Sequence, residues 1–415
     1  MTAWNPVYRV KVNGTTVTGA TLSGLTITSG REDIYQQPLA GYCNLTLIET
    51  AEAAVPYEIN DAVTIEVQDS TATYVNIFGG FITDLGVIVQ TSGSTATSQQ
   101  IKIVAVGALA RLNRSIFEGN VAHEFDGDRI LTLLGSVLFD QWNEVPAAEA
   151  WDDYDVTTQW QDAENSGLGT IDTPGNYELH SQTGLNNTVY NLASQYATSG
   201  LGYLFEDAQG RINYADSTHR TSYLAAEGYV DLDGNHAIGP GLSILARAGD
   251  VRNDITISYG ANSGNTINDQ DIDSVSIFGL LGSTISTTLR HQADAEDQAA
   301  FYLLIRAYPQ FAMKQITFPI ASGEIDNADR DHLINVFMGM PVNIVNLPSN
   351  MVNGEFQGFV EGWTWTASSN QLNLTLTVSP LAFSLQAMTW GDVPVVESWN
   401  TINPALYWLD ATIVA

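Results

Sequence analysis

The 415-residue chain has little positive charge. It contains 15 lysines and arginines against 46 aspartates and glutamates, for a formal net charge of −31. The only lysines are Lys11, Lys102 and Lys314. Tight binding of nucleic acid depends largely on lysine and arginine, so this composition argues against a protein that binds the phosphates of nucleic acid. Solubility or a saline habitat is an alternative explanation of the acidic charge.

Cysteine is also nearly absent. Cys43 is the single one, which excludes a disulfide framework and a thiolate metal cluster, and we expect it to pack as a small apolar residue. The first residues lack a basic segment followed by an apolar one, so they do not resemble a secretion signal. No apolar run approaches the roughly 20 residues that span a bilayer. We therefore expect synthesis in a cytoplasm and no membrane anchor.

Catalytic motifs are missing too. The sequence has no G-x-S-x-G elbow and no phosphate-binding P-loop, and His123-Glu124 lacks the second histidine of a helical zinc protease. The remaining histidines are scattered without the spacing of metal ligands. We expect no enzymatic activity and no cofactor.

One acidic cluster matches part of a calcium-binding loop. Asp269, Asp271 and Asp273 have the alternate spacing with which such a loop begins. Ser274 stands where the loop needs glycine, and Leu280 stands where it needs a bidentate glutamate. These aspartates are the calcium candidate, although the expectation for the chain is that it holds no metal.

What the sequence does contain is a pattern that occurs twice. A V-x-I segment at residues 63–65 and an F-x-G-F segment at 78–81 return at 342–344 and 356–359, offset by 279 and 278 positions. Apolar residues alternate in both copies, as they do in half-buried strands. The pattern predicts a duplicated β-domain in which Gly80 and Gly358 lie at equivalent positions of close backbone approach, and in which Phe81 and Phe359 point into the cores. The structural positions of the two copies are Phe78, Gly80, Phe81, Phe356, Gly358 and Phe359.

Changes in hydrophobic periodicity and composition divide the chain into four parts. In residues 1–114 apolar and polar residues alternate, which predicts a first β-domain. Residues 115–240 indicate an α+β insertion, with a helix from residue 126, another at 188–196 and a hairpin turning at Gly210. Residues 241–385 form a second β-region, with a helix at 294–308 and the second β-copy at 340–383. Residues 386–415 form a tail whose aromatics predict contacts with partner proteins. These aromatics are Trp390, Trp399 and Trp408.

The residues resemble a known family. The segments SGREDI (29–34), QPLAGYCNL (37–45), INDAVTI (59–65) and FGGFI (78–82), with WNTINPALYWLD (399–410) near the end, are similar to the hub proteins of tailed bacteriophages. These minor tail proteins form the baseplate hub or tail tip, especially of long non-contractile tails.

The resemblance implies a mainly β fold with two related β-barrel domains and smaller inserted domains, assembled as a ring. It implies a homotrimer whose six barrels adapt the hexameric tail tube to a trimeric tip. It also implies contacts with distal tail and tail tube proteins, the tape-measure protein and other minor tail or fibre proteins. DNA would pass through the ring without specific binding, and carboxylates lining the passage would repel it. The expected location is the tail tip of a virion.

A second hypothesis comes from the tryptophans of residues 386–415 and from the pairs of acidic residues in the chain. An extracellular protein that binds or hydrolyses carbohydrate also uses such residues, and paired carboxylates roughly 5–9 Å apart hydrolyse glycosides. A stable trimer without affinity for sugars favours the hub, and a monomer that turns over glycans favours the enzyme.

Overall fold

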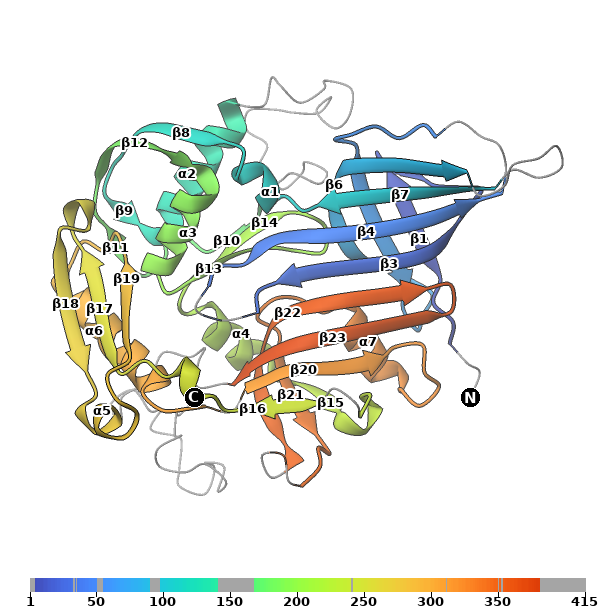
Figure 1. Ribbon diagram of the computed structural model, residues 1–415. Coiled ribbons are helices and arrows are strands. Elements are labelled where there is room, and N and C mark those ends of the chain that lie inside the picture. The colour runs from blue at the N-terminus through green and yellow to red at the C-terminus, as the bar shows by residue number, and fades with distance from the viewer. Residues whose placement is uncertain are drawn as a thin grey trace.

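The computed structural model (Figure 1) describes residues 4–32, 34, 36–50, 55–89, 98–140, 168–239, 242–310, 312–349, 351 and 354–380. The chain is mainly β, and its largest element is a 13-stranded sheet built from two distant parts of the sequence. Its first half consists of β1 (Tyr8–Val12), β2 (Thr15–Thr16), β3 (Ala20–Gly30), β4 (Leu39–Glu49), β5 (Ala62–Gln68), β6 (Tyr74–Val89) and β7 (Gln99–Val106). Its second half consists of β15 (Val230–Asp233), β16 (Ser243–Leu245), β20 (Ala312–Pro319), β21 (Pro341–Val345), β22 (Phe356–Ser368) and β23 (Gln371–Pro380).

The two halves have the same strand order. The first runs β1-β5-β6-β7-β4-β3, and the second runs β15-β21-β22-β23-β20-β16. One difference is that β1 is antiparallel to β5, whereas β15 is parallel to β21. The register also repeats: Val63 lies opposite Gly80, and Val342 lies opposite Gly358. Even a bulge recurs, between Ile82 and Asp84 in β6 and between Val360 and Gly362 in β22. The predicted duplication is therefore present in the strand order, the register and the bulge.

The two halves do not form the two separate closed barrels that were expected. Within the described part of the chain, hydrogen bonding runs without a break from one half to the other, because β22 pairs with β3. The result is one antiparallel-rich sheet with open margins.

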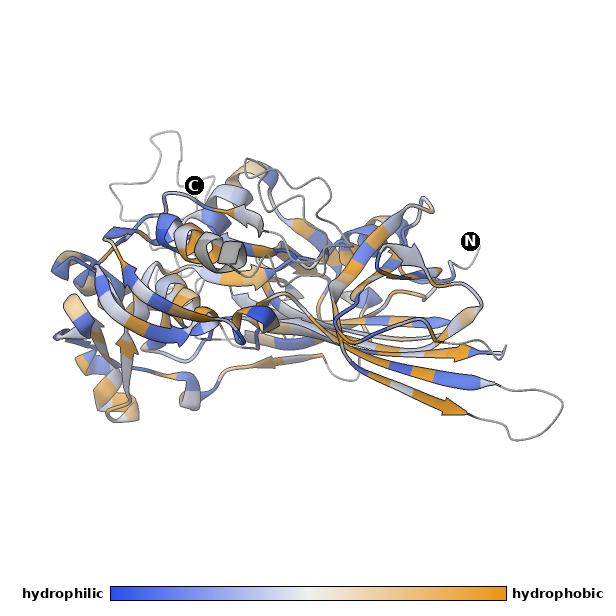
Figure 2. Cartoon of the chain, turned by 90° about the horizontal axis from the view of Figure 1, so that it is seen from above, coloured by the Kyte–Doolittle hydropathy of each residue, from blue (hydrophilic) through white to orange (hydrophobic). Residues whose placement is uncertain are grey.

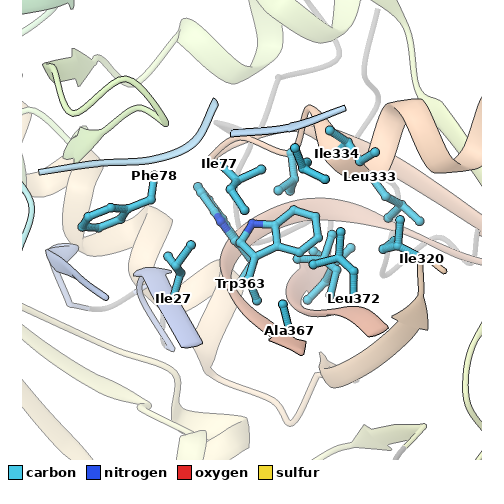
Figure 3. Close-up of a cluster of buried hydrophobic side chains, with 14 of the residues drawn as sticks. Ile27, Ile77, Phe78, Ile320, Leu333, Ile334, Trp363, Ala367 and Leu372 are labelled. Atoms are coloured by element: carbon cyan, nitrogen blue, oxygen red, sulfur yellow. The ribbon is translucent and has the colours of Figure 1, made fainter. Parts of the chain in front are cut away.

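A single apolar core lies under both halves of this sheet. Alternate residues of the long strands point into it, as the period of two requires, and Figure 2 shows the corresponding alternation of hydrophobic and hydrophilic positions. Trp363 and Trp365 of β22 lie within this core, and Leu333 of α7 (Asn327–Ile334) packs there from the second half. Figure 3 shows Trp363 surrounded by Ile77 and aliphatic side chains of the other strands and α7.

A second core belongs to the segments inserted between the strands of the sheet. It joins helices α2 (Asp126–Asp140) and α3 (Val189–Ser199) to strand β17 (Asp254–Tyr259) and helix α6 (Gln292–Arg306), since Leu133, Leu192, Ile257 and Leu303 belong to one buried cluster. The first group of inserted elements is α1 (Leu109–Leu112), β8 (Ile116–Val121), β9 (Glu124–Phe125), α2 (Asp126–Asp140), β10 (Leu168–Ile171), β11 (Glu178–Leu179), β12 (Gln182–Thr188), α3 (Val189–Ser199), β13 (Tyr203–Glu206), β14 (Ile212–Ala215) and α4 (His219–Glu227). The second group is β17 (Asp254–Tyr259), β18 (Asn265–Gln270), α5 (Ile272–Phe278), β19 (Gly282–Ser286) and α6 (Gln292–Arg306).

Local signals explain where several of these elements begin and turn. The Thr188 side chain accepts a hydrogen bond from the Asn191 amide and caps α3. Gly210 turns the β13–β14 hairpin with a φ of 81°. This hairpin contacts β6 closely: a Cβ on Gly79 would lie 2.4 Å from the carbonyl carbon and oxygen of Gln209. The glycine at position 79 thus lets the insertion dock on the first half of the sheet.

Candidate functional site

The joint between the two halves is a run of direct backbone pairing. Six residues of β22 pair with six of β3, from Gly362 opposite Gly30 to Ala367 opposite Leu25. At one end, the Arg31 amide donates to the Glu361 carbonyl at 2.9 Å. Gly30 has a φ of 84°, and a Cβ there would lie 2.3 Å from that same carbonyl oxygen. Glycine is therefore required for the strands to approach this closely.

A buried carboxylate fastens the joint from the side. Glu361 occupies the bulge of β22 and is 1% exposed. Its Oε2 accepts from Arg31 Nε at 2.7 Å and from Arg220 Nη2 at 3.0 Å. Its Oε1 accepts from Arg220 Nη1 and from the Ser379 hydroxyl, both at 2.6 Å. One carboxylate thus ties together the end of β3, helix α4, β22 and β23.

The charges of this cluster balance in favour of the ionised carboxylate. Burial raises the pKa of Glu361, but Arg220 and Arg31 outweigh burial and hold the pKa at about 2. The Arg220 guanidinium also lies 4.5 Å from the centre of the Tyr203 ring and 5.3 Å from that of Phe359. Both oxygens of the carboxylate accept hydrogen bonds, so the cluster holds these elements together and has a structural role.

A second, half-buried carboxylate lies where the insertion meets the first half. Glu206, at the end of β13, accepts from the Gly41 amide at 2.8 Å and from the Leu109 amide. Burial raises the pKa of Glu206 to about 7, despite these two donors, which favour the ionised form. A Cβ on Gly107 would lie 1.9 Å from a Glu206 carboxylate oxygen, so glycine leaves the space that this side chain occupies.

The face of the main sheet opposite the core is lined with hydroxyl groups. Four threonines lie directly opposite one another across four strands: Thr317, Thr375, Thr364 and Thr28. The hydroxyls of Thr317 and Thr375 are 2.9 Å apart and share a hydrogen bond. A neighbouring row across β23, β22, β3 and β4 consists of Asn373, Thr366, Thr26 and Asn44.

This face carries little charge. Its period-two positions on β20, β23, β22, β3, β4, β7 and the end of β6 include one carboxylate, Asp84, together with Lys102. Lys314 lies on β20, beside the bulge of that strand. Two of the three lysines are therefore on these strands, whereas the acidic residues of the described chain lie mostly elsewhere.

The phenylalanines of the repeated pattern occupy two faces. Phe78 and Phe356 point into the main core. Phe81 and Phe359 do not, which corrects the expectation, because residues three apart on a strand point to opposite faces. They are buried from the other side: Phe359 packs with Leu224 of α4, and the Arg111 guanidinium lies 4.4 Å from the centre of the Phe81 ring.

The two glycines of the pattern occupy matching positions. A Cβ on Gly80 would lie 2.4 Å from the Val106 carbonyl oxygen, and a Cβ on Gly358 would lie 2.0 Å from that of Ser379. Val106 and Ser379 are themselves equivalent, since they pair with Phe81 and Phe359. In both halves glycine therefore allows the neighbouring strand to come close.

The three aspartates of the calcium candidate do not converge. Asp269 lies at the end of β18, Asp271 caps α5 by accepting from the Ser274 amide at 2.8 Å, and Asp273 lies in the first turn of that helix. Among the described residues, the three acidic or histidine side chains that do come together are His236, Asp326 and Asp329.

That second group has a structural explanation. His236 Nδ1 lies 2.7 Å from Asp329 Oδ2, which also accepts from the Asp233 amide at 3.1 Å. Asp326 caps α7 by accepting from the Asp329 amide. These contacts anchor α7 to the turn after β15.

Trp390, Trp399 and Trp408 lie outside the described residues. No helix in the described part of the chain combines the length and the apolar character that a membrane crossing needs.

Sequence reasoning missed the charged groups that hold the sheet together. Arg31, Arg220, Glu206 and Glu361 stand in unremarkable local contexts, far apart along the chain. One signal was available for Glu361: it is a lone acidic residue inside an apolar strand pattern, where an unpaired charge costs too much to be kept.

No protein-family model and no curated protein matches the chain. The tail protein from Neisseria meningitidis MC58 has a TM-score of 0.59 at 12% identity, over 92% of this chain and 98% of that chain. The 43 kDa tail protein of prophage MuSo2 from Shewanella oneidensis has a TM-score of 0.57 at 12% identity, over 91% and 99%. At such identities the likeness establishes the fold: over most of its length, this chain folds like these two tail proteins.

Proposed function

We propose that the chain is a structural, non-enzymatic protein of a bacteriophage tail, located at the tail tip as the hub that adapts a hexameric tail tube to a trimeric tip. The observation that carries this proposal is the repeat inside the sheet. One chain presents the same strand order and register twice, with Val63 opposite Gly80 and Val342 opposite Gly358. The fold shared with two tail proteins supports the tail as the location.

The repeat has a direct consequence for symmetry. Each chain supplies two equivalent units, so three chains supply six, which is the number that a hexameric tube offers for contact. Closing the sheets around a common axis would also complete the barrel-like arrangement that a single chain leaves open. Distal tail and tube proteins would dock on one end of this ring, and the tape-measure protein, other minor tail proteins or fibres would occupy the rest.

In this arrangement the threonine-rich face of the main sheet forms the wall of the passage. A wall of hydroxyls and amides gives DNA phosphates few cations to pair with, so DNA passes without the counterion release that would hold it. The proposal changes the expectation of a carboxylate-lined passage: Asp84 is the carboxylate on this face, and the large acidic charge would lie outside the passage.

Electron microscopy of labelled particles tests the location. Antibody raised against the chain should mark the distal end of the tail in virions, and purified protein should form assemblies of about three times the 44.9 kDa chain. Label along the tube or at the head would contradict the hub. A monomer that hydrolyses or binds glycans would favour the alternative, a carbohydrate-active protein.

A further inference from the structure

We propose that the free edge of β6, residues 84–89, pairs edge to edge with β16 of a second copy of the chain, in the register that β22 and β3 use within one chain. The proposal rests on the internal repeat and deepens the proposed hub function by naming the surfaces through which copies join. It stands on three features: an unpaired apolar edge, an internal joint at the equivalent position, and a complementary edge on the other half.

Among the described strands, the end of β6 has no partner along one of its edges. β5 pairs with β6 only as far as Phe81, while β7 pairs with its other edge through Val89. From Leu85 to Val89 the sequence has no charge and no proline, the two devices with which proteins protect exposed edges. Val87, Ile88 and Val89 are 46%, 43% and 64% exposed. Figure 2 shows this end of β6 as an orange arrowhead at the margin of the molecule.

The equivalent edge in the second half is covered. The shared bulge aligns Asp84 with Gly362, and from there Leu85 to Val89 correspond one for one to residues 363–367 of β22. In β22 these residues pair with β3. Trp365, the counterpart of Val87, is 0% exposed. Within the described chain, the same position is therefore buried where a neighbouring strand pairs with it and partly exposed where no described strand does.

The partner edge follows from the same equivalence. In the first half, Ile27 of β3 lies opposite Cys43 of β4, which lies opposite Ala105 of β7. In the second half, Ile244 of β16 lies opposite Met313 of β20, which lies opposite Val378 of β23. β16 is thus the counterpart of β3. Among the described strands β16 pairs with β20 alone, so its other edge is open. Figure 1 shows β6 and β16 at opposite sides of the sheet.

The register can be transferred from the joint to the contact between copies. Within one chain Trp365 lies opposite Ile27 and Thr366 opposite Thr26. Transferred by the repeat, these pairs become Val87 opposite Ile244 of the second copy and Ile88 opposite Ser243 of the second copy. The first pair continues the apolar core from one copy into the next, and the second lies on the hydroxyl-lined face.

The two edges differ, which makes the contact heterologous. A copy offers β6 to one neighbour and β16 to another, so the same contact repeats head to tail. Such a contact gives a ring when the rotation between copies closes, which is what the proposed hub requires. A contact of β6 with itself would instead give a symmetric pair and leave β16 bare.

Disulfide trapping tests the pairing. The chain with Ile88→Cys and the chain with Ser243→Cys should each stay monomeric on non-reducing gels, and an oxidised mixture of the two should shift to the covalent dimer. The double variant should give a ladder. The native thiol at Cys43 does not interfere, because it is fully buried. A matched control tests whether any two exposed cysteines become linked. Ile277 is an exposed residue on α5, and a mixture of Ile88→Cys with Ile277→Cys should give at least tenfold less dimer.

The outcomes separate this contact from the proposed function. Dimers from Ile88→Cys alone would indicate a symmetric contact and overturn the proposal, as would a mixture that stays monomeric at the highest concentration reached. A ladder that ends at three chains supports both the contact and the hub, whereas one that ends at another number keeps the contact and removes the trimeric hub. An assembly of three chains without any trapped dimer would keep the hub and refute the β6–β16 contact.

An edge variant gives a second readout. Val87→Asp places a charge in the proposed contact but leaves the β6–β7 pairing intact, so it should abolish assembly while the thermal unfolding of the monomer changes little. Ile272→Asp, at a residue that is 74% exposed on α5, is the matched control and should assemble normally. Unchanged assembly of Val87→Asp would overturn the proposal.

Discussion

Replacing Glu361 by glutamine should destabilise the joint between the two halves more than any comparable surface change. The amide would point a donor at the guanidinium groups of Arg31 and Arg220, where Oε2 now accepts from both. Removing the charge of one partner from a buried ion pair lowers the free energy of unfolding by about 3–5 kcal/mol, because the remaining charges stay buried without compensation.

The pKa of Glu361 gives an independent value for the same interaction. It falls from 4.5 to about 2 in the folded chain, and each unit corresponds to about 1.4 kcal/mol, so ionisation stabilises the fold by roughly 3 kcal/mol. Since the folded-state pKa is lowered, this contribution is fully present above about pH 4.5 and is lost as the pH falls towards 2. The variant should therefore lose stability at neutral pH and should lack that acid-dependent step.

Urea unfolding followed by tryptophan fluorescence measures the effect, since Trp363 and Trp365 lie on the same strand as Glu361. Glu178→Gln is the matched control: its ion pair with Arg290 has a similar length of 2.7 Å but lies at the surface, and its loss should change stability little. Equal midpoints for the two variants, or a Glu361→Gln chain as stable as the native one at pH 7, would refute the assignment of Glu361 as the fastener of the joint.

Three further predictions concern Glu206, Phe359 and Gly358. The raised pKa of Glu206 predicts that its contribution to stability is full below about pH 4.5 and is lost as the pH rises through about 7, so Glu206→Gln should flatten the decline of the melting temperature across that window. Phe359→Ala should cost about 3–5 kcal/mol by leaving a cavity under α4, while His123→Ala, on an exposed side chain, should leave the urea midpoint almost unchanged. Gly358→Ala should lower the free energy of unfolding by about 1–3 kcal/mol, because its Cβ clashes with the neighbouring strand. Gly24 is a strand glycine with open space around it, so Gly24→Ala should leave stability unchanged. Similar urea midpoints for both variants would show that the close approach at Gly358 is unimportant.

The repeated unit could be predicted from the sequence because it is local. The period of two in V-x-I and F-x-G-F fixes which residues of a strand share a face, and the constant offset shows that the same strand pairing occurs twice. The same reasoning was wrong for Phe81 and Phe359. The motif placed them in strands, but their burial depends on α4 and α1, which cover the other side of those strands.

The helix at residues 188–196 and the hairpin turn at Gly210 were predictable for a similar reason. The cap at Thr188 and the turn at Gly210 involve residues within a few positions of one another, so their effect can be inferred from neighbours in the chain. The aspartates of the calcium candidate show the limit of this approach. Their spacing suggested convergence, but a strand end followed by a helix cap directs them to different places.

The sequence by itself determined the β class of the chain, its duplication and the alternation that gives the main sheet one apolar and one polar face, since all three depend on intervals of a few residues. Only the tertiary structure decided that the two halves share one sheet instead of closing as separate barrels, because this depends on β3 meeting β22 some 330 positions away, as the Arg31–Glu361 contact does. It also decided that Glu361 is neutralised by Arg31 and Arg220, and that among the described strands one edge of β6 lacks a partner while its counterpart in β22 pairs with β3. Pairing between distant segments is set by the packing of the whole chain, and no local interval in the sequence encodes it.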